Sequence, residues 1–141
     1  MSREILFRGK AANRIKGFEY RTKYKNGDWV YGLLTDCENY AGFAEMTNTN
    51  GVSGIEVDKE TVGQYTGLTD KNGTKIFEGD IIKDTDYGCL HLIKYFGDEN
   101  YPAFDCEPSV QFCDCNGLSH LACNNVLEVI GNIHDNPELL N

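Results

Sequence analysis

The sequence has 141 residues, 40% of them hydrophobic and 25% charged, a composition that suits one soluble domain or two small subdomains with a shared core. No apolar run approaches the ~20 residues needed to span a membrane, and the alternating charges near the start exclude a signal peptide. We therefore expect a cytoplasmic protein whose six cysteines are thiols.

The net charge of −9 is unevenly distributed along the chain. Residues 1–30 contain eight Lys/Arg against three Asp/Glu, a net charge of +5. Residues 31–141 contain five against nineteen, a net charge of −14. A basic first part on an acidic body can be self-complementary, within one chain or between copies, or it can form a partner site.

The first part of the chain reads as short strands separated by glycine turns. Trp29, Tyr31 and Leu33 alternate with Val30 and so share one strand face. Asn-Gly pairs occur at 26–27, 50–51, 72–73 and 116–117, and this dipeptide is the strongest short hairpin signal. Strands are predicted at 5–7, 18–21, 29–34, 40–46 and 52–57.

The stretch from 60 to 82 specifies its local structure most completely. Asn72-Gly73 predicts a two-residue type I′ turn, because both residues tolerate a positive φ. Gly79 then allows a tight corner before Ile81 and Ile82. A ligand loop could also use Asp70, Glu78 and Asp80, but turn chemistry explains every polar position of this stretch.

The remaining segments complete an all-β prediction. Residues 88–96 are apolar on both strand faces, which is typical of a central strand, and residues 110–112 and 126–130 supply the last strands. Asn136 is typical of a helix N-cap and Pro137 of the first helical position. One short helical turn is therefore predicted at the C-terminal end of the sequence. No long amphipathic helix is expected.

Several motifs resemble the YopX family of phage and prophage proteins. They are Arg3–Lys10, Gly27–Gly32, Val62–Asp70, Ile76–Ile82 and Glu128–Leu140, in the order in which that family has them. The resemblance implies a β-rich fold with an SH3-like barrel in the second half, and a phage or prophage origin. It implies no activity. Two stretches depart from the family pattern: the segment between Lys10 and Asn26 is longer, and the segment from Cys106 to Cys123 is rich in cysteine.

We therefore expect a small N-terminal β-subdomain over residues 1–59 and an SH3-like barrel over residues 60–141. The two are expected to pack closely as one YopX-like unit.

One cluster has metal-ligand chemistry. Cys113, Cys115, His120 and Cys123 lie within eleven residues and could hold Zn²⁺. The Cys-x-Cys spacing argues against it, since neighbouring strand side chains on one face leave little loop to wrap an ion. Inert thiols in a strand explain these cysteines better, and no metal or other cofactor is expected.

A second cluster interleaves basic and aromatic side chains from residue 14 to residue 25. Such a segment could track phosphates while its rings stack on bases. The acidic remainder of the chain opposes nucleic-acid binding, and a cationic hairpin resting on an acidic body explains the pattern equally well. The candidate contacts are Arg14, Lys16, Arg21, Lys23 and Lys25.

No catalytic signature is present. The three histidines, His91, His120 and His134, fit no nucleophile motif, so we expect no enzyme and assign no catalytic residue. The prediction is a non-enzymatic binding module for an unknown host or phage protein, with a homo-oligomer as a further partner state. The alternatives are nucleic-acid binding through the basic segment and imitation of DNA by the acidic surface.

Overall fold

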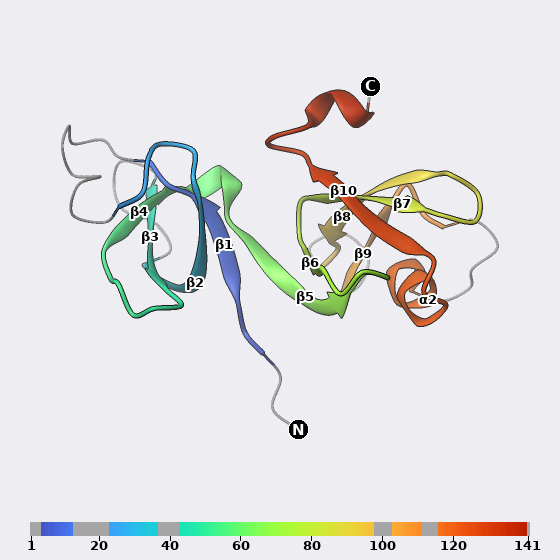
Figure 1. The fold of residues 1–141 in the computed structure, drawn as a ribbon, viewed down its shortest axis with the longest axis horizontal. Helices are drawn as coiled ribbons and strands as arrows, with labels where there is room; N and C mark the ends of the chain where they lie inside the picture. The colour runs from blue at the N-terminus through green and yellow to red at the C-terminus, as the bar shows by residue number, and fades with distance from the viewer. Residues whose placement is uncertain (1–3, 13–22, 37–42, 98–102, 111–115, 141) are drawn as a thin grey trace. The chain divides into compact units, whose positions relative to one another are not determined.

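The computed structural model describes residues 4–12, 23–36, 43–97, 103–110 and 116–140 (Figure 1). As predicted, the regular structure of these residues is mostly β-strand, and the chain forms two compact units, residues 1–64 and residues 65–141. Among the described residues, no helix combines the length and the apolar character that crossing a membrane requires.

The first unit is a curled antiparallel sheet with the strand order β4-β3-β2-β1. Its strands are β1 (Phe7–Lys10), β2 (Trp29–Asp36), β3 (Phe43–Asn48) and β4 (Ile55–Asp58), followed by the short 3-10 helix η1 (Lys59–Thr61). Beyond β1, Ala11 forms an isolated bridge with Val57, and the Ala12 N–H donates to the Glu56 carbonyl at 2.9 Å. The sheet therefore curls until its first strand reaches its last.

Alternation along these strands builds the core of the first unit. Val30 on β2 and Met46 on β3 are fully buried, while their neighbours Tyr31 and Leu33 point to the opposite face. The buried cluster is Ala11, Val30, Ala44, Met46, Ile55 and Val57. The shared face predicted for Trp29, Tyr31 and Leu33 is therefore confirmed.

The second unit contains a four-stranded antiparallel sheet with the order β10-β7-β8-β9. Strand β5 (Gly63–Thr69) begins against β1 and continues into a hairpin with β6 (Lys75–Phe77). The sheet and the helical elements of this unit are β7 (Asp80–Asp84), β8 (Leu90–Tyr95), β9 (Phe104–Glu107), α2 (Gly117–Cys123), β10 (Leu127–Asn132) and η2 (Pro137–Leu140).

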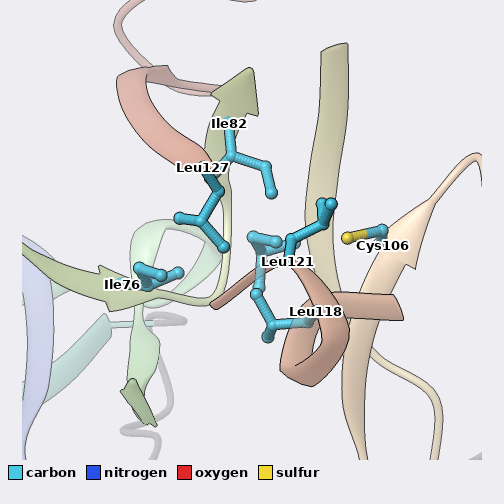
Figure 2. Packing of buried hydrophobic residues seen from close by; sticks show 7 residues of the cluster. Ile76, Ile82, Cys106, Leu118, Leu121 and Leu127 are labelled. Carbon is cyan, nitrogen blue, oxygen red and sulfur yellow. The ribbon is translucent and has the colours of Figure 1, made fainter. Parts of the chain in front are cut away.

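Helix α2 covers one face of this sheet. Leu118 and Leu121 of the helix lie among Ile82, Cys106 and Leu127 (Figure 2). All five side chains are at most 3% exposed, so the core of the second unit lies between the helix and the sheet. Helix η2 confirms the predicted C-terminal turn.

The SH3-like barrel predicted for the second half is not confirmed. In the second unit, the four strands β10-β7-β8-β9 form an open antiparallel sheet, and α2 packs against one of its faces. The predicted strand at 110–112 includes Gln111 and Phe112, which lie outside the described residues, as does the predicted strand at 18–21.

Two of the four Asn-Gly predictions are wrong in detail. Asn116 and Gly117 begin a helix: the Asn116 side chain accepts the Ser119 N–H at 2.9 Å as an N-cap. At the hairpin between β5 and β6, Gly73 has a φ of 81° but Asn72 does not have a positive φ, so the turn is not type I′. The Asp70 side chain decides this turn instead, since it accepts the N–H groups of Asn72 and Thr74.

Asp105 fastens α2 to β9. Its Oδ1 accepts the Cys106 N–H at 2.8 Å and the Leu118 N–H at 3.0 Å, and the residue is 8% exposed. We expect Asp105→Ala to lower the free energy of unfolding by about 2–4 kcal/mol, because it leaves two buried donors without an acceptor. Asp105→Asn keeps an acceptor and should cost much less. Urea denaturation followed by circular dichroism checks this, and equal losses for the two variants would contradict it.

Candidate functional site

The structure tests only half of the predicted zinc cluster. Cys113 and Cys115 lie outside the described residues. His120 and Cys123 lie three residues apart on α2, so they are on a helix and not on the predicted strand. Among the described residues, no group of three or more His, Cys, Asp or Glu side chains could hold a metal ion, and zinc at the full cluster stays a prediction.

The predicted nucleic-acid contacts are also only partly described. Arg14, Lys16 and Arg21 lie outside the described residues, whereas Lys23 and Lys25 precede β2 with exposed side chains. The Lys25 N–H donates to Asp28 Oδ2 at 2.9 Å as part of the turn before β2.

Tyr24, the one aromatic residue of this segment within the described residues, contacts the rest of the first unit. Tyr24 packs against the core of the first unit, and its hydroxyl accepts a hydrogen bond from Asn48 Nδ2 at 3.1 Å. This packing covers part of the Tyr24 ring, whereas Phe18 and Tyr20, the other rings of the segment, lie outside the described residues.

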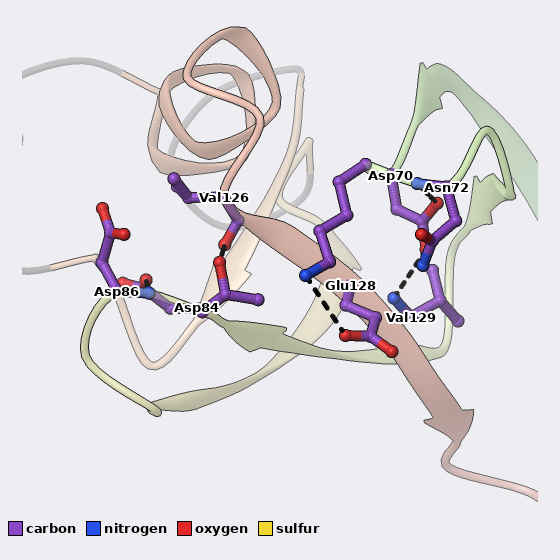
Figure 3. A network of polar contacts seen from close by, with 9 residues as sticks. Asp70, Asn72, Asp84, Asp86, Val126, Glu128 and Val129 are labelled. Carbon is purple, nitrogen blue, oxygen red and sulfur yellow. Dashed lines mark hydrogen bonds and ion pairs between the residues drawn. The ribbon is translucent and has the colours of Figure 1, made fainter.

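Several aspartates that could have been ligands hold turns instead. Asp70 Oδ2 accepts the Val129 N–H at 3.0 Å and so joins its hairpin to β10 (Figure 3). Asp80 Oδ2 accepts the Phe77 N–H at 2.7 Å. Both carboxylates therefore accept backbone N–H groups, which agrees with the prediction that the polar residues of this stretch form turns.

The first unit carries an aromatic surface on β1 and β2, which we call the Trp29 face: Arg8, Lys10, Trp29, Tyr31 and Leu33. Arg8 pairs with Tyr31, and Lys10 pairs with Trp29, across the two strands. Arg8 Cζ lies 4.6 Å and Lys10 Nζ lies 5.4 Å from the centre of the Trp29 ring. Cations at these distances are attracted to the ring face and hold it in place.

The exposure of this face is uneven. Arg8 is 6% exposed, so it forms the base of the surface, whereas Tyr31 is 40% and Leu33 is 53% exposed. Exposed apolar side chains beside a tryptophan with cations on its ring are typical of protein interfaces. They are also found on surfaces that bind single-stranded nucleic acid.

The second unit contains a cavity of about 360 Å³ beside α2. It is lined by residues of the β7–β8 turn, of β8, of the segment after β9 and of α2, among them Asp84, Tyr87, Cys89, His91, His120 and Leu121. A volume of this size is within the range of small-ligand sites.

Two buried polar side chains line this cavity. His91 is 4% exposed, and its Nδ1 lies 2.6 Å from the Pro108 carbonyl oxygen. Because a carbonyl can only accept, Nδ1 carries the hydrogen and Nε2 of the neutral ring is an acceptor. Asp84 is also 4% exposed, and its Oδ1 accepts the Asp86 N–H at 2.9 Å (Figure 3). The same oxygen accepts the Tyr87 N–H at 3.3 Å.

This cavity was not predicted from the sequence. Asp84 and His91 are separated by a turn, and they converge only because β7 and β8 pair and α2 covers their ends. Two of the three histidines, His91 and His120, line the same cavity. The alternation of residues 88–96 does place His91 on the same strand face as the apolar Ile93. A histidine on an apolar face was the one signal that could have indicated a buried polar site.

These features define a mostly β protein of two compact units, with turns held by buried carboxylates. The model of the YopX protein family matches residues 19–141, and the chain belongs to this family. No curated protein matches the sequence. The crystal structure of protein EF1440 from Enterococcus faecalis is similar, with a TM-score of 0.54 and 27% sequence identity. The match covers 99% of this chain and 100% of that one.

Proposed function

We propose that this chain is a non-enzymatic accessory protein of a phage or prophage, acting in the bacterial cytoplasm by binding another protein through the Trp29 face. Membership of the YopX family is consistent with this role. The observation that carries it is the exposure of Tyr31 and Leu33 on a strand of the sheet, next to Trp29. Covering such apolar area lowers the free energy, because it is removed from water.

The chemistry of this face favours a partner of a particular kind. Arg8 and Trp29 form a rigid base, because the guanidinium lies over the ring, and Tyr31 and Leu33 project from it. Tyrosine, tryptophan and arginine are the residues that most often dominate binding energy at interfaces. The partner should present an apolar patch bordered by carboxylates, which would meet Lys10.

The faces of the sheets suit binding better than their edges do. In the second unit, Lys71 N–H and Asp70 Oδ2 bond to the backbone of β10, and Asn116 Nδ2 donates to the Phe104 carbonyl on β9. Edge groups that are already bonded offer less to an incoming strand. A homo-oligomer would then also form through the Trp29 face.

Removal of the two projecting side chains should abolish binding. We expect the double variant Tyr31→Ser, Leu33→Ser to recover about tenfold less of a stoichiometric host protein than the unaltered chain in a pull-down. Val52→Ser is the matched control, because Val52 is 40% exposed in a turn of the same unit. Equal recovery by all three chains would contradict the proposal.

The same experiment separates the alternatives. Nucleic-acid binding is the second candidate, because cations and aromatic rings share the Trp29 face. In that case nuclease treatment would remove the captured material, and recovery would fall steeply with salt. Capture that resists nuclease and disappears in the double variant supports protein binding. Light scattering of the purified chain identifies a second copy as the partner.

A further inference from the structure

The cavity beside α2 is lined by two side chains that each have one atom without a hydrogen-bond partner in the described part of the chain. Asp84 Oδ2 and His91 Nε2 have no hydrogen-bond partner among the described residues, although both residues are 4% exposed and line the same cavity. Neither atom is among the fully buried ones, so both are open to a ligand in the cavity. A few polar groups among apolar walls are the usual arrangement of a small-ligand site.

Both side chains are held in fixed positions by their other atoms. Two backbone N–H groups hold Asp84 Oδ1, and the Pro108 carbonyl holds His91 Nδ1. The cavity therefore presents a preorganised carboxylate oxygen and imidazole nitrogen, so a ligand would bind without first ordering them. The charge of Asp84, together with that of Asp86 in the same lining, excludes an anionic ligand.

The apolar walls of the cavity favour a weakly hydrated cation over a strongly hydrated one. Val110, Leu121 and Val126 give it apolar sides, and the Tyr87 ring, 81% exposed, belongs to its lining. A guanidinium or amidinium group is planar, has several N–H donors in fixed directions, and is less strongly hydrated than an ammonium. Such a group loses less on entering an apolar-walled cavity, and it can also stack on a tyrosine ring.

We propose that this cavity binds a guanidinium or amidinium group, which donates to Asp84 Oδ2 and His91 Nε2. The inference is independent of the Trp29 face, because the cavity lies in the second unit. Such a group can come from a free small molecule or from an arginine side chain of a polypeptide. Both sources share the same contacts.

Titration of the full chain with benzamidine tests the proposal by two-dimensional NMR of the backbone amides. We expect saturable shifts for Tyr87, Cys89 and Asn124, which line the cavity. Benzyl alcohol, a neutral ring of similar size, should give no saturable shift. Absence of saturation with benzamidine, or equal binding of benzyl alcohol, would overturn the proposal.

Two variants test the acceptors separately. Asp84→Asn can keep the turn, since the amide oxygen still accepts the two N–H groups, but it should weaken benzamidine binding about tenfold to a hundredfold. His91→Asn keeps a donor for Pro108 and removes Nε2, so it should also weaken binding. Asp58→Asn is the matched control, because Asp58 also accepts a backbone N–H, from Glu60, but lies in the first unit. Unchanged affinity in Asp84→Asn and His91→Asn would refute the assignment.

Two further probes distinguish a free amidine from an arginine side chain of a polypeptide as the natural ligand. N-acetylarginine methylamide represents an arginine side chain in a polypeptide, and binding comparable to that of benzamidine assigns the site to such a chain. Binding of benzamidine without it assigns the site to a free amidine. N-acetyllysine methylamide should bind more weakly than either cation, and equal binding would overturn the requirement for a planar group.

Discussion

Replacement of Gly32 by alanine is expected to be the most damaging single change in the first unit. A Cβ atom at this position would lie 1.9 Å from the Thr47 carbonyl oxygen and 2.8 Å from Asn48 Cα, both of which are backbone atoms of β3. The neighbouring strand cannot give way by rotating a side chain, so the β2–β3 pairing must separate. We expect a loss of roughly 3–5 kcal/mol in the free energy of unfolding.

The fluorescence of Trp29 measures this loss directly, because it is the only tryptophan and lies in the affected unit. Gly51→Ala is the control: it has a φ of 85° and no atom within 4 Å of an added Cβ. Its cost should be only the conformational strain, about 1–2 kcal/mol. If Gly32→Ala cost no more than Gly51→Ala, the close approach of β2 and β3 would be wrong.

Asp70→Ala is expected to have the largest effect in the second unit. The Asp70 carboxylate accepts the N–H groups of Asn72, Thr74 and Val129 at 2.8, 2.9 and 3.0 Å, and the residue is 6% exposed. Alanine removes both acceptor oxygens, so three N–H groups lose their partner and the hairpin loses one of its bonds to β10. We expect the free energy of unfolding to fall by roughly 3–5 kcal/mol, measured by urea denaturation.

Two controls divide this effect into its parts. Asp70→Asn keeps an oxygen for the turn but points an amide toward the Val129 N–H, so its cost should be intermediate. Lys71→Ala removes only the neighbouring ion pair with Glu128, 3.8 Å long and partly exposed, and should cost less than about 1 kcal/mol (Figure 3). Faster hydrogen exchange at Val129 should accompany both Asp70 variants, and unchanged exchange would contradict the assigned bond.

The two proposals concern surfaces with different chemistry. The Trp29 face is an exposed apolar surface with cations at its base, and it suits a protein partner. The cavity beside α2 has apolar walls and the two acceptors of Asp84 and His91, and it suits a small cationic group. Because each has its own variants and its own readout, failure of one leaves the other standing.

Much of the β-structure could be predicted from local sequence. The alternation at residues 29–34 set the two faces of β2, and the glycines at 27, 51 and 73 do adopt positive φ values. The type I′ turn at Asn72 was wrong because a nearby carboxylate competes for the turn amides. Helix α2 was missed because seven residues show little periodicity, and its cap, Asn116, also begins a hairpin signal.

Most strand segments, their faces and the family could be inferred from the amino-acid sequence, since these follow from neighbouring residues and short motifs. The packing of α2 on an open sheet, and the position of Asp84 and His91 at one cavity, became known from the folded chain alone. Such convergence depends on strand pairing and helix packing between segments far apart in the chain. Those contacts leave no periodic trace in the sequence, so local patterns could not reveal them.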